Sequence, residues 1–235
     1  MKRQIFLDTE TTGLDPAQGH RIIELAAVEV VDRRLTGNRY HTYLNPERDI
    51  EAGAQAVHGI TLERLQGEPR FADIAREFLD FIAGAELVIH NAPFDIGFLN
   101  HELGLIDLGR IADVCGGVED TLKMAKDKHP GQRNNLDALC RRYGVDNSNR
   151  TLHGALLDAE LLADVYMAMT RGQESLLIDV GPHAEAAIEA QFSRQQPLTV
   201  IAANGEELAA HRDYLAALDK PALWNMNHIE KREWN

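Results

Sequence analysis

A chain of 235 residues, of which 44% are hydrophobic, can bury one sizeable core and is too apolar to be a disordered segment. The formal net charge of −13 argues against nonspecific binding to nucleic acid by the chain as a whole. The sequence has no apolar run near 18 residues and no signal-peptide pattern, and its two cysteines are too few for a disulfide framework. We therefore expect a cytoplasmic protein that does not enter a membrane.

The first part of the chain predicts three strands. Ile5, Phe6 and Leu7 form a short apolar run that suits a buried strand, and residues 21–31 are rich in Ile, Val and Ala. Alternation over 39–44 predicts a third strand, joined to the second by a turn at 36–38. We expect these strands to form an antiparallel meander, with a short helix from residue 52.

Strands and helices alternate further along the chain. Helical spacing predicts helices over 71–82, from 91–92 to 104, over 118–128, over 136–143 and from 155 to 171. Strands are expected at 87–89 and 111–115. The order predicts an α/β fold with a mixed sheet, three antiparallel strands followed by parallel strands, flanked by helices. Residues 173–197 read as a linker, followed by an expected strand at 198–201 and an expected helix at 206–218. Residues 198–235 are too few to bury a core alone, so we expect them to dock on another protein.

Two carboxylates, Asp8 and Glu10, follow the first apolar run at a spacing of two. Residues i and i+2 of an extended chain point to the same face, so the two charges lie side by side. Their repulsion is relieved by a proton or, better, by a hard divalent cation such as Mg²⁺ or Mn²⁺. A solvated acidic turn is the alternative, and the pair alone does not decide between the two interpretations.

Three further polar residues lie at the edges of predicted elements. Asp95 falls in the first turn of a helix, Asp158 lies beside an apolar helix face, and His153 comes just before that helix. With Asp8 and Glu10 they would converge at one end of the sheet and hold two divalent ions for in-line attack on a phosphodiester. Asp8 is best placed to bridge both ions, with Glu10 and Asp158 completing the first and Asp95 the second. His153 would take the proton of the attacking water.

A basic stretch stands out in this acidic chain. Between residues 121 and 153 there are seven Lys or Arg residues and three Asp residues. Such a patch would meet phosphates, but a solvated helical face is an equally good interpretation of the sequence.

Three motifs together carry a family signature: DTETTG at 8–13, HNAPFD at 90–95 and HGALLD at 153–158. They resemble the motifs of the DEDDh group of DnaQ-like exonucleases, and the chain is similar throughout to the proofreading members of that family in bacterial replicative polymerases. The resemblance implies a ribonuclease-H-like exonuclease domain over 1–172 that removes nucleotides 3′→5′ from DNA as nucleoside 5′-monophosphates. It implies that the carboxylates of Asp8, Glu10, Asp95 and Asp158 bind the metal ions. It also implies that His153 is the general base.

The resemblance also points to residues that contact the substrate. His58 matches a position that contacts the terminal nucleotide, and His90 matches one that lines the same site. The turn after the first strand would bring Thr11 and Thr12 close to that nucleotide, beside the carboxylates of motifs one and three. A DNA 3′ end that binds as in the family would therefore contact these residues.

The remaining part of the chain resembles partner-binding segments of the same family. Gln173, Leu176 and Leu177 fit a peptide that binds the sliding clamp, and the segment ending near Trp224 resembles the part that tethers the exonuclease to the polymerase (alpha) subunit. The sequence leaves open whether a further small accessory subunit binds. Two rival interpretations are a stand-alone RNA exonuclease of the same family and a non-catalytic replisome scaffold.

Overall fold

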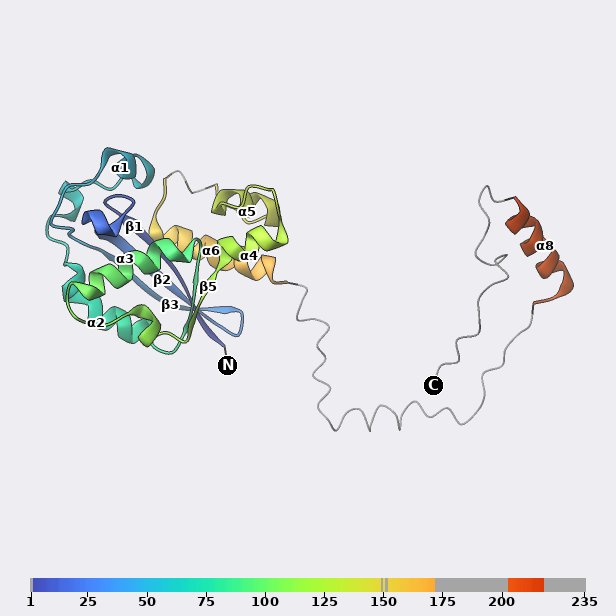
Figure 1. The fold of residues 1–235 in the computed structure, drawn as a ribbon, viewed down its shortest axis with the longest axis horizontal. Helices are drawn as coiled ribbons and strands as arrows, with labels where there is room; N and C mark the ends of the chain where they lie inside the picture. Colours follow the sequence, from blue (N-terminus) through green and yellow to red (C-terminus); the bar gives the residue numbers. More distant parts are fainter. Residues whose placement is uncertain (1, 149, 151, 172–202, 218–235) are drawn as a thin grey trace, which may run out of the picture. The chain divides into compact units, whose positions relative to one another are not determined.

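The structure is a computed structural model that describes residues 2–148, 150, 152–171 and 203–217 (Figure 1). The described residues fall into two units, a large one up to residue 171 and a helix within 203–217. Within the described residues no helix is both long and apolar enough to cross a membrane.

The large unit is built on a five-stranded mixed sheet with the strand order β3-β2-β1-β4-β5. β1 pairs antiparallel with β2 and parallel with β4, β2 pairs antiparallel with β3, and β4 pairs parallel with β5. The strands are β1 Arg3–Thr11, β2 Ile22–Val31, β3 Arg34–Tyr43, β4 Glu86–Ile89 and β5 Gly117–Asp120. Three antiparallel strands followed by parallel ones confirm the predicted fold class.

Helices cover both faces of this sheet (Figure 1). They are α1 Ala52–His58, α2 Phe71–Ile82, α3 Ala92–Gly104, α4 Thr121–Lys128, α5 Leu136–Tyr143 and α6 Ala155–Met169, with short 3-10 turns η1 Pro16–Gln18, η2 Glu63–Leu65 and η3 Ile111–Asp113. Alternation along β1 separates two cores: Ile5 and Leu7 pack with residues of α2 and α3, and Phe6 packs with residues of α5 and α6. Asp8 and Glu10 share the parity of Phe6, so they belong to the face that α6 covers.

Two sequence predictions about the sheet are wrong. The β2–β3 turn is at Asp32 and Arg33, which both adopt positive φ, whereas residues 36–38 form an irregularity inside β3. The strand expected at 111–115 is instead the turn η3, and β5 follows at Gly117–Asp120, within the first residues of the helix expected at 118–128. β5 is short and lies at the sheet edge, so little of it is buried and its sequence carries little apolar signal.

The second unit consists of α8, Gly205–Ala216, which begins at the capping residue Asn204. The helix expected at 206–218 is thus confirmed in place, and none of its residues is buried. Several sequence predictions fall outside the described residues, namely the strand at 198–201 and the partner contacts at Gln173, Leu176, Leu177 and Trp224.

Candidate active site

The carboxylates of motif one lie inside β1, which continues through them to Thr11. The register shifts between Glu10 and Thr11, so the strand is irregular just where the acidic pair ends. Asp8 is half-buried and Glu10 is buried. A rigid central strand therefore fixes two carboxylates on the α6 face, as the spacing predicted.

Asp95 reaches the same region from the other face of the sheet. It lies in the first turn of α3, is only 3% exposed, and accepts a 2.7 Å hydrogen bond from the hydroxyl of Thr9. Thr9 points to the α3 face because it alternates with Asp8 and Glu10. α3 starts after Asn91, whose φ of 69° turns the chain sharply out of β4. β1 thus carries carboxylates on one face and anchors a third from the other.

Asp158 and His153 come from the start of α6. Asp158 is buried in its first turn, and its Oδ2 lies 3.4 Å from Nδ1 of His153, whose side chain is 46% exposed. Gly154, the N-cap residue of this helix, has no side chain to cap it, but Glu24 of β2 accepts a 3.2 Å hydrogen bond from the backbone N–H of Ala155. Glu24 pairs directly with Glu10 across the two strands, so the same contact brings Asp158 beside Glu10.

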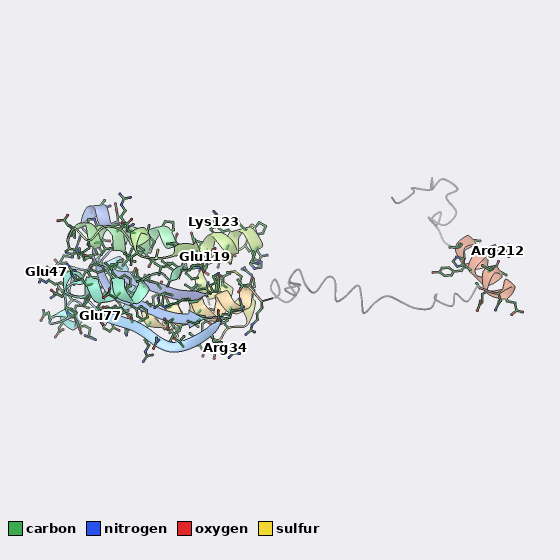
Figure 2. The ribbon with its side chains drawn as sticks, turned by 90° about the horizontal axis from the view of Figure 1, so that it is seen from below. Arg34, Glu47, Glu77, Glu119, Lys123 and Arg212 are labelled. Carbon is green, nitrogen blue, oxygen red and sulfur yellow. The ribbon has the colours of Figure 1, made fainter. Side chains whose placement is uncertain are left out.

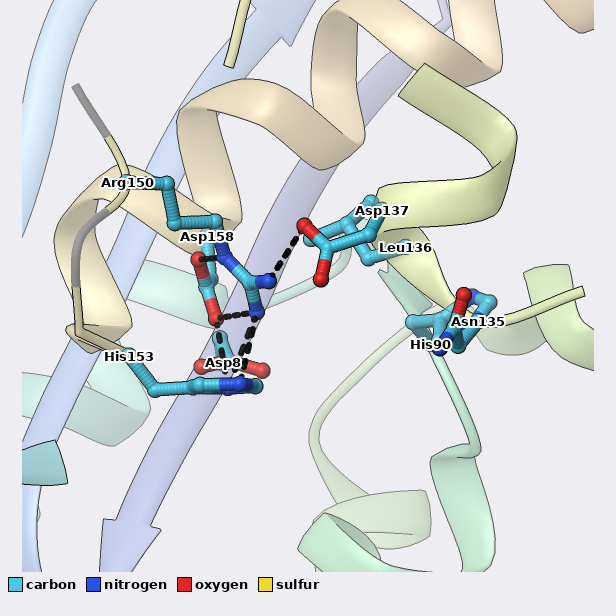
Figure 3. A pocket seen from close by; sticks show the side chains of 8 residues that line it. All are labelled: Asp8, His90, Asn135, Leu136, Asp137, Arg150, His153 and Asp158. Atoms are coloured by element: carbon cyan, nitrogen blue, oxygen red, sulfur yellow. Dashed lines mark hydrogen bonds and ion pairs between the residues drawn. The ribbon is translucent and has the colours of Figure 1, made fainter. Parts of the chain in front are cut away.

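Arg150 holds this acidic cluster together, and sequence reasoning counted it only as one of the basic residues between 121 and 153. Its Nε and Nη2 donate to the two carboxylate oxygens of Asp158 at 2.5 and 2.7 Å, and Nη1 donates to Asp137 at 2.7 Å (Figure 3). Nη2 also lies 2.8 Å from Nδ1 of His153. A basic residue three positions before a motif histidine was the available signal, but loop position alone says nothing about where a side chain points.

The electrostatics of the cluster show an excess of buried negative charge. Burial and the charges of Asp158 and Glu24 raise the pKa of Glu10 to about 8. Burial, followed by the neighbouring carboxylates of Asp95 and Glu10, holds the pKa of Asp8 well above its usual range, and burial raises the pKa of Asp95 to about 7. Asp158 differs. Burial is the largest single influence and raises its pKa, but hydrogen bonds from Arg150 and His153, together with the charges of both, bring that pKa below its usual value.

This donor set fits a hard divalent cation. Ligand atoms of Glu10, His153 and Asp158 all lie within 4.8 Å of one another. Asp8 and Asp95 are not in that group, but Asp8 interacts electrostatically with Asp95, Glu10 and Asp158. The carboxylates have raised pKa values, and only one guanidinium balances their negative charge. A divalent ion stabilises carboxylates in such a setting. The structure brings the five residues of the motifs together, and their roles as ligands and base stay a prediction.

Two cavities flank the carboxylates. One, of about 210 Å³, is lined by Asp8, His90, Asp158, His153 and Arg150, together with the first residues of α5. The other, of about 410 Å³, has Glu10 in its lining. It is lined largely by apolar and small groups, namely Thr9, Glu10, Thr11, Gly13, Leu14, Glu51, Gly53, Ala54, Val57, His58 and Phe94.

The two histidines expected at the substrate lie in different cavities, His90 in the smaller and His58 in the larger. His58 is 5% exposed, its Nδ1 accepts from the backbone N–H of Ile60 at 3.0 Å, and its Nε2 has no hydrogen-bond partner among the described residues. Thr11 lines the larger cavity. Thr12 does not line it, because Thr12 is fully buried and its hydroxyl lies 3.0 Å from Nδ1 of His20.

Comparison with known proteins shows the class of protein to which the chain belongs. Residues 5–166 match the family model described as Exonuclease. Exonuclease X, solved in complex with 5′ overhanging duplex DNA, is 28% identical with a TM-score of 0.55, over 72% of this chain and 90% of that one. Escherichia coli exonuclease I, in a zinc-bound complex with single-stranded DNA, has a TM-score of 0.65 over 74% of this chain and 41% of that one; at 19% identity it shows the fold alone.

Curated relatives narrow this class. The DNA polymerase III subunit epsilon of Pasteurella multocida (strain Pm70) is 50% identical over 232 residues, covering 95% of this chain and 92% of the relative. That of Escherichia coli (strain K12) is 50% identical over 236 residues, covering 94% and 97%. The chain belongs to the exonuclease family and, within it, to the family of DNA polymerase III epsilon subunits. The exonuclease family uses divalent metal ions, in agreement with the donor set.

Proposed function

We propose that this chain is a 3′→5′ DNA exonuclease that proofreads newly synthesised DNA within a bacterial replicative polymerase and releases nucleoside 5′-monophosphates. The observation that carries the proposal is the convergence of Asp8, Glu10, Asp95 and Asp158 from three separate elements around one point of the sheet. The names of the curated relatives support the replicative setting, and the complex of exonuclease X supports DNA as substrate.

The same four carboxylates would hold two divalent ions, Mg²⁺ or Mn²⁺. Bound there, such ions would polarise the phosphodiester and lower the pKa of a water molecule. Asp8 is suited to serve both ions, because the charges of Asp95, Glu10 and Asp158 all act on its pKa. The acidic cluster repels anions, so the phosphate that is cleaved enters the cluster only when cations balance its charge.

We assign to His153 the role of taking a proton from the attacking water. Its imidazole is half exposed, which lets it pass the proton on to solvent, and the carboxylate of Asp158 at 3.4 Å orients the ring. The backbone N–H of His153 donates to the carbonyl of Val57 at 3.2 Å, so the loop before α6 is fixed to α1. This contact holds the base at a set position between the two cavities.

The larger cavity would bind the terminal nucleotide. Leu14, Val57 and Phe94 offer apolar surface to a base and sugar, and the buried Nε2 of His58 offers a polar contact that no described residue uses. Apolar stacking accepts any base, as a proofreader requires. Selection for mispaired ends follows from the need for an unpaired terminus, because a mismatch separates from its template at lower cost.

Partner binding would account for the acidic charge of the chain. We assign residues 173–177, with Gln173, Leu176 and Leu177, to the sliding clamp, and residues 198–235, with Trp224, to the DNA polymerase III alpha (polymerase) subunit. These assignments rest on the sequence resemblance. When partners hold the DNA, the local concentration of the 3′ end is high, so an exonuclease with a net charge of −13 needs little affinity of its own.

The proposal is tested with purified full-length chain, Mg²⁺ and a 5′-labelled DNA oligonucleotide. We expect a ladder that shortens from the 3′ end, release of nucleoside 5′-monophosphates, and faster removal of a mispaired than of a paired terminal nucleotide. An RNA of the same sequence is the comparison substrate. Much faster degradation of RNA would contradict the substrate assignment and favour a stand-alone RNA exonuclease, and no metal-dependent hydrolysis of either would favour a scaffold.

A further inference from the structure

The hairpin formed by α4 and α5, residues 121–143, is charged oppositely to the rest of the chain. It contains six basic and two acidic residues, and one of the acids, Asp137, is already paired with Arg150. Among the ion pairs between described residues, none involves a basic residue of the hairpin. We call these six residues the hairpin basic set: Lys123, Lys126, Lys128, Arg133, Arg141 and Arg142.

The hairpin is a fixed scaffold for these charges. Nε2 of His129 lies 2.7 Å from the hydroxyl of Tyr143, which joins the ends of the two helices. Arg142 donates to the side chain of Asn134 at 2.9 Å and to the carbonyl of Arg133 at 2.8 Å, which fixes the connecting loop. On its inner side, Ala125 of α4 and Leu136, Leu139 and Cys140 of α5 pack with residues of α6. Most of the basic set is therefore exposed on the outer side.

The hairpin starts at the active site. The hydroxyl of Thr121, the first residue of α4, lies 3.0 Å from Nδ1 of His90, which lines the smaller cavity. Asn135, Leu136 and Asp137, at the start of α5, line the same cavity. α4 has eight residues and extends about 12 Å from this rim, about the length of three to four nucleotides of a B-form strand.

One alternative explains part of the basic set. Lys126, Lys128 and Arg141 lie in the last turns of their helices, where a positive charge complements the helix dipole. That explanation fails for Lys123, because it lies in the first turn of α4, where the dipole disfavours a cation. It also fails for Arg133, which lies in the loop between the helices. Both side chains are exposed.

We propose that the hairpin basic set binds phosphates of the DNA strand on the 5′ side of the nucleotide being removed. This inference rests on the proposed exonuclease function and extends it beyond the cleaved nucleotide. Phosphate contacts by lysine and arginine position a strand without reading its sequence, which suits a proofreader. A locally basic surface also lets an acidic protein meet DNA in one orientation, with the 3′ end at the carboxylates.

The test uses the full chain with Lys123→Ala, Lys126→Ala and Arg133→Ala combined. A control variant combines Arg34→Ala, Arg39→Ala and Arg76→Ala, which changes the net charge equally at exposed positions on β3 and α2. β3 and β5 are opposite edges of the sheet, and Figure 2 shows Lys123 and Arg34 on opposite sides of the domain. Binding to a fluorescent single-stranded DNA 12-mer is measured in EDTA over a range of salt concentrations. Hydrolysis of a dinucleotide is measured separately in Mg²⁺.

We expect the hairpin variant to bind the 12-mer on the order of tenfold more weakly at low salt, with the slope of log K against log salt reduced by about 2. The control variant should bind like the wild type. Dinucleotide hydrolysis should be unchanged, because a dinucleotide is too short to reach along α4. An unchanged slope, or an equal loss in the control variant, would overturn the proposal. Because binding is read in EDTA, it decides this proposal even if the wild-type chain proves not to hydrolyse DNA.

Discussion

Removal of the Arg150 guanidinium tests the electrostatic account of the site. The Arg150 side chain is 6% exposed and donates to both oxygens of Asp158, which is itself 5% exposed. Arg150→Gln leaves that carboxylate beside Asp8 and Glu10 without its cation, and loss of one partner of a buried ion pair costs about 3–5 kcal/mol. The bond to Asp137 adds little, because that side chain is 39% exposed. We expect a loss of about 3 kcal/mol, which lowers Tm by roughly 6–12 °C in a domain of this size.

The measurement is urea unfolding in EDTA at pH 8 and at pH 5. Arg150 lowers the pKa of Asp158, so the stabilisation is present above the unfolded pKa and is lost as the pH falls through the folded one. In the variant, burial raises the pKa of Asp158 without the opposing guanidinium, so the carboxyl takes up a proton at a higher pH than in wild type, and the stability difference between the two chains is largest at pH 8 and shrinks as the pH falls. Arg141→Gln, at an exposed position, is the control and should change stability by less than about 0.5 kcal/mol. Equal stability of Arg150→Gln and wild type at pH 8 would show that the guanidinium does not stabilise the buried carboxylate of Asp158.

Three more predictions concern single positions. The pKa of Glu10 is raised to about 8, so the folded state holds a proton that the unfolded chain releases, and stability in EDTA should fall between pH 6 and pH 8.5. Glu10→Gln should flatten this pH dependence in urea titrations. An equal fall in the variant would show that Glu10 is not the source of the pH dependence. Gly13→Ala places a Cβ 2.3–2.6 Å from the ring of His20 and should cost about 1–3 kcal/mol, whereas Gly97→Ala in α3 meets nothing within 4 Å and should stabilise by about 0.5–1 kcal/mol; thermal unfolding of both checks the contrast. His58→Ala should raise KM for a dinucleotide about tenfold with kcat little changed, and an unchanged KM would remove His58 from the nucleotide contact.

The elements with strong local signals were predictable. The sequence predicted α2 at 71–82 and α5 at 136–143 with the bounds that the structure has, because each combines helical apolar spacing with a clear start or stop. α3 was predicted from Pro93 at its start and Gly104 at its end. The parity of Asp8 and Glu10 along one strand likewise followed from backbone geometry alone.

The errors arose where tertiary contacts override local preference. Residues 36–38 have turn composition, but two of them contact Glu29 of β2. The side chains of Thr36 and Asn38 each donate to the Glu29 carboxylate at 2.8 Å. The turn falls instead at Asp32 and Arg33, where Arg33 adopts φ 64° and donates to the carbonyl of Met167 in α6 at 2.8 Å. A long-range contact of this kind compensates a strained backbone and leaves no mark in the local sequence.

The sequence predicted the acidic residues of the site but not the residue that balances their charge. Motif spacing placed Asp8, Glu10 and Asp158 at the ends of regular elements, and the structure brings them together. The contacts of Arg150 were not predictable, because it lies in a loop 13 residues after its partner Asp137 and eight before Asp158. Neither spacing corresponds to a helix or strand repeat that would connect these residues. The N-terminal contact of α6 from Glu24, 131 residues away in sequence, is equally invisible to local pattern.

The most direct test of the central claim compares the wild-type chain with the double variant Asp8→Ala, Glu10→Ala on a DNA primer with a mispaired 3′ end. We predict Mg²⁺-dependent removal of the mispaired nucleotide by the wild type and its abolition in the variant, while co-elution with the polymerase subunit is unchanged. Removal of nucleotides by the double variant at the wild-type rate would contradict the assignment of these carboxylates to catalysis.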